Sequence, residues 1–226
     1  MRVLYCNKYN FAFSGTEAYL FELMELMRTH EHEVALFSMA DARGQPTPFD
    51  EYFLPHIDFK APDQGIVTRA KLAIHAIYST EARQQLRRMI SAFQPEIAHV
   101  RNIYHHLSPS ILWELKAQGV PAVYHLNDFK LLCPVYNMVK HGQACKKSCL
   151  GQFWHVFSEG CYAGPRSEAL VLVAEAYFHQ WLGSYRKCVD RFLVPSRFAK
   201  QQLVENGFDA RKITVLPHFQ KLPAQP

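Results

Sequence analysis

The sequence contains no hydrophobic run long enough to cross a membrane. A transmembrane helix needs about 20 consecutive apolar residues, and the nearest candidate, residues 169–174, ends at Glu175. Residues 2–6 also lack the apolar core of a secretory signal peptide, which is ~7–15 residues long. We therefore expect a cytoplasmic protein, with the inner face of the membrane as a further place of action.

Blocks of one charge and nucleotide-cofactor fingerprints are missing as well. Lys and Arg number 25 against 20 Asp and Glu, and this net charge of +5 is spread along the chain. No motif supports nucleic-acid binding, so we expect no nucleic-acid partner. The Gly-x-Gly-x-x-Gly fingerprint is absent, which argues against a nicotinamide or flavin dehydrogenase.

Six short apolar runs recur along the chain, with helix-like stretches between them. They are rich in Val, Ile, Leu and Tyr without polar alternation, which is typical of strands covered on both faces. Strands that alternate with helices predict an α/β fold, a Rossmann-like parallel sheet flanked by helices. The runs are residues 3–6, 34–37, 97–100, 122–126, 192–194 and 213–216.

Several helices carry recognisable start signals. Ser14 and Glu17 form a capping-box pattern, Ser108-Pro109 predicts a helix with Pro at its first position, and Ser196 is a third N-cap candidate. One long basic amphipathic helix is predicted between residues 68 and 93, and another helix between residues 167 and 185. The basic helix is either a solvated face or a contact with anionic lipid.

Five motifs occur in a family-like order. They are Ser14-Gly15-Thr16-Glu17, residues 95–102 (PEIAHVRN), residues 127–134 (NDFKLLCP), residues 194–198 (VPSRF) and residues 215–217 (VLP). Together they resemble the N-terminal domain of retaining GT-B glycosyltransferases, the group 1 type that is subfamily 4-like. The resemblance covers the chain from Met1 to about Phe219.

The resemblance implies half of an enzyme. Residues 1–219 would form the acceptor-side Rossmann-like domain, with a Cys-containing insertion at 133–164, and residues 220–226 a tail or interdomain linker. A C-terminal donor-binding domain, in cis or in trans, would hold most of the nucleotide-sugar site, and no cofactor is expected for catalysis. The complete enzyme would transfer a sugar from a nucleotide sugar to a glycan or lipid-linked acceptor in cell-envelope glycan biosynthesis. The alternative is a non-catalytic module that docks to a partner chain.

Candidate site residues follow three of the predicted strands. Gly15, between Ser14 and Thr16, opens a helix where backbone N–H groups could bind phosphate; an ordinary capping box is the alternative. Arg101 and Asn102 leave the third strand, where a guanidinium could bind phosphate or a carboxylate. Tyr104 would stack on sugar or pack the loop, and the resemblance adds Arg197 as a substrate-binding candidate.

The fourth strand ends at the candidate catalytic residues. The carboxyl ends of parallel strands are where such sheets bind ligands. In the family a His-Asp pair stands here; Asp128 matches the Asp, whereas Asn127 occupies the position of the His. His125 lies two residues earlier, so the strand period places it on the same face as Asn127. A structural histidine and a turn residue are the alternatives.

Four cysteines fall within 29 residues, spaced by eleven, three and eleven residues. Four soft ligands with a close central pair suit a structural tetrahedral zinc. Independent thiols in the core are the alternative, as we expect for Cys6 and Cys188. The candidate zinc ligands are Cys133, Cys145, Cys149 and Cys161.

Overall fold

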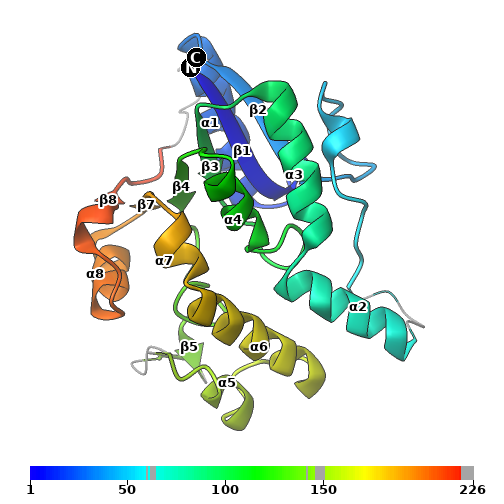
Figure 1. Cartoon of the computed structure of the whole chain (residues 1–226). Helices are drawn as coiled ribbons and strands as arrows, with labels where there is room; N and C mark the ends of the chain where they lie inside the picture. Colours follow the sequence, from blue (N-terminus) through cyan, green and yellow to red (C-terminus); the bar gives the residue numbers. More distant parts are fainter. Residues whose placement is uncertain (60, 62–64, 141, 146–150, 220–226) are drawn as a thin grey trace, which may run out of the picture.

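A computed structural model of the chain describes residues 1–59, 61, 65–140, 142–145 and 151–219. Its centre is a sheet of six parallel strands in the order β2-β1-β3-β4-β7-β8 (Figure 1). All six predicted runs are confirmed as strands. In that order the strands are Glu33–Met39, Arg2–Tyr9, Ile97–Val100, Ala122–His125, Arg191–Val194 and Ile213–Val215.

Helices cover both faces of this sheet. Alternation along β1 sends Val3 and Tyr5 to the face of α1, while Leu4 and Cys6 join the core beneath α3 and α4. The described helices are α1 Gly15–Thr29, α2 Ile66–Ile77, α3 Thr80–Phe93, α4 Ser110–Ala117, α5 His155–Ser158, α6 Arg166–Leu182, α7 Ser184–Cys188 and α8 Arg197–Glu205. The remaining described elements are two 3-10 turns, Asp50–Tyr52 and Ala210–Lys212, and a hairpin of β5 Val139–Lys140 and β6 Gln143–Ala144.

Two of the three start signals are confirmed in place. Ser14 accepts from the Thr16 N–H and caps α1, and Ser196 accepts from the Ala199 N–H and caps α8. The Ser108-Pro109 prediction is wrong by one residue, because α4 begins at Ser110. Ser108 itself has a φ of +61°, which a helix start does not use.

The predicted long helix over residues 68–93 is wrong: the structure has two helices. Tyr78 and Ser79 adopt extended backbone between α2 and α3, and the Ser79 hydroxyl accepts from the Ala82 N–H at 3.0 Å. A side-chain cap in mid-sequence restarts the helix there. Among the described residues, no helix is both long and apolar enough to cross a bilayer.

Candidate functional site

The carboxyl edge of the sheet gathers side chains from three strands. Arg101 follows β3, His125 ends β4, and Asn7 lies near the end of β1. All three are almost fully buried, with exposed fractions of 1%, 0% and 0%. Because buried polar groups are costly unless they are hydrogen-bonded, their partners decide what this edge can bind.

Arg101 is under-satisfied. Its Nη1 lies 3.3 Å from His125 Nδ1, and its Cζ lies 4.7 Å from the centre of the Tyr19 ring. Nε and Nη2 are buried and have no hydrogen-bond partner in the described part of the chain. Burial lowers the pKa of the guanidinium, and the negative charge of Glu17 partly opposes this. Two buried donor nitrogens of Arg101 therefore have no acceptor within the described chain.

His125 adds a third buried donor. Arg101 can only donate, so His125 Nδ1 accepts and the proton of the neutral ring lies on Nε2. His99 Nε2 is 3.1 Å from the same Nδ1. Burial, with the positive charge of Arg101, lowers the pKa of His125 to about 2 and that of His99 to about 3. His125 is thus neutral at pH 7, and its Nε2 has no partner among residues 1–59, 61, 65–140, 142–145 and 151–219.

Asn127 and Asp128 lie beside this group, just after β4. The Asp128 carboxylate accepts from the Tyr104 hydroxyl at 2.8 Å and from the Lys130 backbone N–H at 2.9 Å. Burial raises the pKa of Asp128, although these hydrogen bonds oppose the rise. Asn127 Nδ2 donates to Asp128 Oδ2 at 3.4 Å, while its Oδ1 is buried without a partner within the described chain.

Tyr104 packs the loop. Its ring is 4% exposed and stacks on Tyr136 with centroids 6.3 Å apart, and its hydroxyl fixes Asp128. Because the ring stacks on Tyr136 and the hydroxyl is engaged by Asp128, the geometry favours the packing alternative for Tyr104. Asn102 is half-buried and its carbonyl accepts from the Lys8 N–H at 2.9 Å. Arg197 begins α8 after β7, and its side chain is exposed.

The β1–α1 turn is a capping structure with open space beside it. Ser14 Oγ donates to Glu17 Oε2 at 2.6 Å, and Glu17 is fully buried. A Cβ at Gly15 would meet no atom of the described chain within 4 Å. Since the Glu17 carboxylate already lies in the first turn of α1, this helix end is less available to another anion than Arg101 is. Phosphate binding at Ser14, Gly15 and Thr16 stays a prediction.

Four residues of this edge have no site role in the sequence-based prediction: Asn7, Lys8, Glu17 and Tyr19. Lys8 is partly buried, and burial lowers its pKa against the opposing charges of Glu17 and Asp128. Glu17 accepts from Asn7 Nδ2 at 3.4 Å. Tyr19 covers Arg101 from α1. Asn7 directly follows the first apolar run, as Arg101 follows the third, and Lys8 comes next. This parallel was the available signal.

The last described residues cross the same edge. The His218 ring lies 4.6 Å from that of Tyr19 and 5.3 Å from that of His125, and Phe219 lies 4.9 Å from Tyr19. These contacts extend past β8, which ends at Val215 and not at the predicted Leu216. The predicted tail, residues 220–226, lies outside the described residues.

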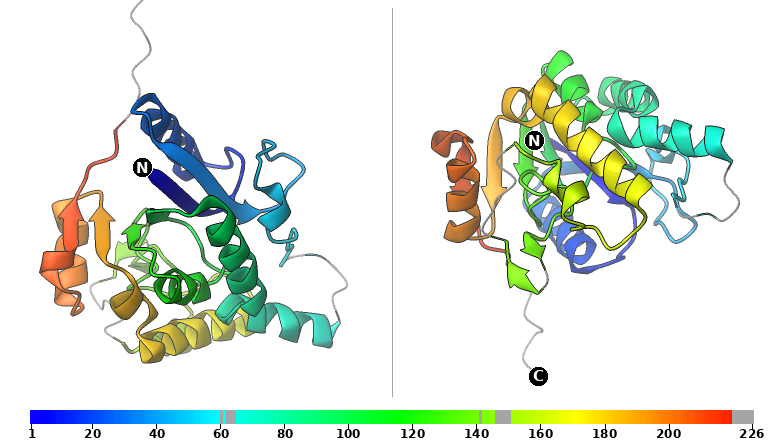
Figure 2. Two further views of the ribbon diagram at one scale, coloured as in Figure 1. Left: turned by 45° about the horizontal axis from the view of Figure 1, so that its top comes forward. Right: turned by 90° about the horizontal axis from the view of Figure 1, so that it is seen from below.

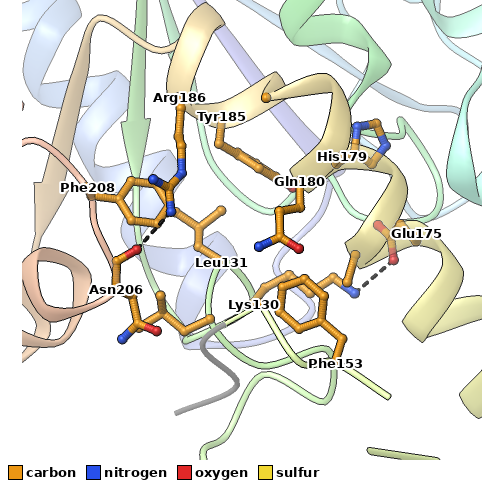
Figure 3. Close-up of a pocket in the computed structure, with 14 residues that line it drawn as sticks. Lys130, Leu131, Phe153, Glu175, His179, Gln180, Tyr185, Arg186, Asn206 and Phe208 are labelled. Carbon is orange, nitrogen blue, oxygen red and sulfur yellow. Dashed lines mark hydrogen bonds and ion pairs between the residues drawn. The ribbon is translucent and has the colours of Figure 1, made fainter. Parts of the chain in front are cut away.

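A separate cavity of about 170 Å³ lies behind this edge, between the segment after β4 and helices α6 and α7. Figure 3 shows Lys130 reaching across it to Glu175. Both side chains are buried, and Lys130 Nζ lies 2.8 Å from Glu175 Oε2 and 3.3 Å from the Pro134 carbonyl. No predicted catalytic or substrate-binding residue lines the cavity in the part of the chain that is described.

The cysteine segment shows neighbouring thiols. Burial raises the pKa of Cys161, and Cys133 and Cys145 raise it further, whereas Lys140 lowers it. Within the described ranges, no three His, Cys, Asp or Glu side chains form a group that could hold a metal ion. Cys149 lies outside the described residues. The zinc stays a prediction, which elemental analysis would test: one zinc per chain is expected, and none would contradict it.

The sequence matches the glycosyl transferase 4-like domain over residues 14–218. The chain belongs to this family. No curated protein matches it. The family therefore rests on the sequence match, and the predicted resemblance is confirmed.

Solved structures of similar fold belong to longer chains. Anabaena Alr3699/HepE in complex with UDP is 11% identical with a TM-score of 0.46, covering 96% of this chain and 44% of that one. Acinetobacter baumannii MurG is 10% identical, TM-score 0.48, with 97% and 46% covered. Neisseria meningitidis UDP-GlcNAc 2-epimerase bound to UDP-GlcNAc is 12% identical, TM-score 0.46, with 95% and 45% covered. The chain spans less than half the length of these structures.

Proposed function

We propose that this chain is the acceptor-binding half of a retaining glycosyltransferase. The complete enzyme would transfer a sugar from a nucleotide sugar to a glycan or lipid-linked acceptor. The observation that carries the proposal is the set of three buried donor nitrogens without acceptors at the carboxyl edge, within the described chain: Nε and Nη2 of Arg101 and Nε2 of His125. Family membership over residues 14–218 supports a sugar-transfer reaction at that edge.

These donors suit an oxygen-rich anion. A buried guanidinium binds phosphate or carboxylate with charge-assisted hydrogen bonds, about twice as strong as those between neutral groups. The neutral imidazole of His125 can donate a hydrogen bond to such a group, but its lowered pKa makes it unsuited to hold a proton as a cationic acid. We assign Arg101 and His125 to binding a phosphate or carboxylate of the substrates.

Asp128 and Asn127 would orient the acceptor. Tyr104 and the Lys130 amide hold the Asp128 carboxylate in place, and Asn127 presents an unpaired amide oxygen beside it. An acceptor hydroxyl could donate to that oxygen, which would fix its direction relative to the donor sugar. The partner half would supply the remaining nucleotide-sugar contacts and exclude water on closure.

A nucleotide-sugar titration and a transfer assay test this function. We expect weak binding and no turnover of UDP-glucose by this chain alone, and transfer with retained anomeric configuration once a donor-binding half is present in cis or in trans. Tight UDP-glucose binding by the chain alone would contradict the division of labour. Specific binding to a partner chain without any transfer would favour the alternative, a non-catalytic docking module.

A further inference from the structure

Helix α2 stands out from the body of the protein. It projects beyond the sheet in the views of Figures 1 and 2. Of its twelve residues only Ala76 is buried. Ile66, Val67 and Ile74 are 88%, 69% and 66% exposed. A helix in water normally turns such side chains toward a core, so these residues lie where another apolar phase can reach them.

Two half-buried aromatic side chains continue the apolar surface from α2 onto α6. Tyr78 directly follows α2, and its ring lies 5.9 Å from that of Phe178 on α6. Phe178 in turn lies 6.2 Å from Trp181, which is 78% exposed. We call Ile66, Val67, Ile74, Tyr78, Phe178 and Trp181 the α2–α6 surface.

The charges on α2 are of one sign. Arg69 and Lys71 are exposed, and the helix contains no Asp or Glu. Two basic residues of α3 are neutralised instead, because Arg83 and Arg87 both pair with the buried Glu114 of α4. The predicted contact of a basic helix with anionic lipid therefore applies to α2 and not to α3. The cations of α2 have no acidic residue on their own helix to neutralise them.

We infer that the α2–α6 surface docks on a membrane that contains anionic lipids. Apolar side chains and an exposed Trp with flanking Arg and Lys match an interfacial helix, whose apolar face enters the acyl boundary while its cations meet lipid phosphates. A soluble protein partner would match the apolar part, but the unopposed Arg69 and Lys71 favour an anionic surface.

Docking there would bring the carboxyl edge close to the bilayer. His75 Nε2 of α2 lies 2.8 Å from the His106 carbonyl, in the loop that follows β3 and Arg101. The α2–α6 surface is distinct from the edge itself, so the inference does not depend on the proposed reaction. It adds a lipid surface as the place from which an acceptor could reach that edge.

Vesicle sedimentation tests the inference with the whole chain. We expect binding to phosphatidylcholine vesicles that contain phosphatidylglycerol, weakening at high salt, and little binding to phosphatidylcholine alone. Val67→Ser with Ile74→Ser should weaken partitioning by roughly tenfold or more, and so should Arg69→Gln with Lys71→Gln. Both pairs are exposed, so the variants should keep the wild-type melting temperature.

A matched control and a spectroscopic signal sharpen the test. Phe198 is 58% exposed on α8, away from this surface, so Phe198→Ser should bind as the wild type does. The emission of Trp181 should shift to shorter wavelength on vesicles, and Trp181→Phe should lose this shift. Three results would each overturn the inference. They are wild-type binding by the Val67→Ser, Ile74→Ser variant, no binding of the wild type to anionic vesicles, and a wild-type dimer that this double variant abolishes.

Discussion

Replacing Arg101 by Met should make the protein more stable and remove its anion binding. Each of the two unpaired N–H groups of Arg101 costs about 1–3 kcal/mol while buried. The variant loses the hydrogen bond to His125 and the contact with the Tyr19 ring, about 1 kcal/mol each. Methionine keeps much of the aliphatic volume. The expected net gain is about 2 kcal/mol, the middle of a range of about 0–4 kcal/mol, which corresponds to roughly 4–8 °C in melting temperature for a chain of this size.

Thermal denaturation with and without inorganic pyrophosphate measures both effects. Pyrophosphate should raise the melting temperature of the wild type by mass action and leave that of Arg101→Met unchanged. Arg211→Met is the matched control, because that side chain is 90% exposed and pairs with Asp209 at the surface; its stability should stay within about 0.5 kcal/mol. A destabilised Arg101→Met that still responds to pyrophosphate would refute the reasoning.

Three further predictions address the surroundings of this site. Burial lowers the pKa of His125 from 6.5 to about 2, so the unfolded state binds more protons than the folded state below about pH 6.5. The free energy of unfolding should therefore fall as the pH drops below 6.5. In urea titrations at several pH values His125→Gln should flatten this pH dependence, and an unchanged dependence would contradict the prediction. Lys130→Met leaves the buried Glu175 carboxylate without its ion pair and should cost about 3–5 kcal/mol, whereas adding Glu175→Leu should restore most of this stability. Equal stability of the single and double variants would show that the cost does not come from the unpaired carboxylate. Gly15→Ala meets open space and should be nearly neutral for stability, while Gly207→Ala, at a φ of +78°, should cost about 1 kcal/mol; equal costs would contradict the described backbone.

The strand edge was predictable because its determinants are local. An apolar run of three to five residues specifies each buried strand, and the residue that follows it must lie at the carboxyl edge. Arg101, His125, Asn127 and Asp128 were found in this way. Asn7 satisfies the same rule, with Lys8 next to it, and both could have been included with no further information.

Other features depend on contacts that are distant in sequence. Glu17 reads as part of a capping box, and only folding shows that Asn7, ten residues earlier, also donates to it. His218 is 93 residues from His125, yet their rings lie 5.3 Å apart. No periodicity encodes such pairs, because side-chain distances across a sheet depend on strand order.

The sequence by itself determined the parallel α/β sheet, the caps at Ser14 and Ser196, and the family. Hydrophobic periodicity and capping chemistry act over a few residues, so they can be read along the chain. The tertiary structure alone decided that Arg101 is buried with unpaired donors and that Tyr104 packs inside. It also decided that Arg83 and Arg87 of α3 pair with Glu114 of α4, whereas α2 carries cations and no carboxylate. Burial and pairing are properties of the packed chain, because they depend on which distant groups reach the same few ångströms.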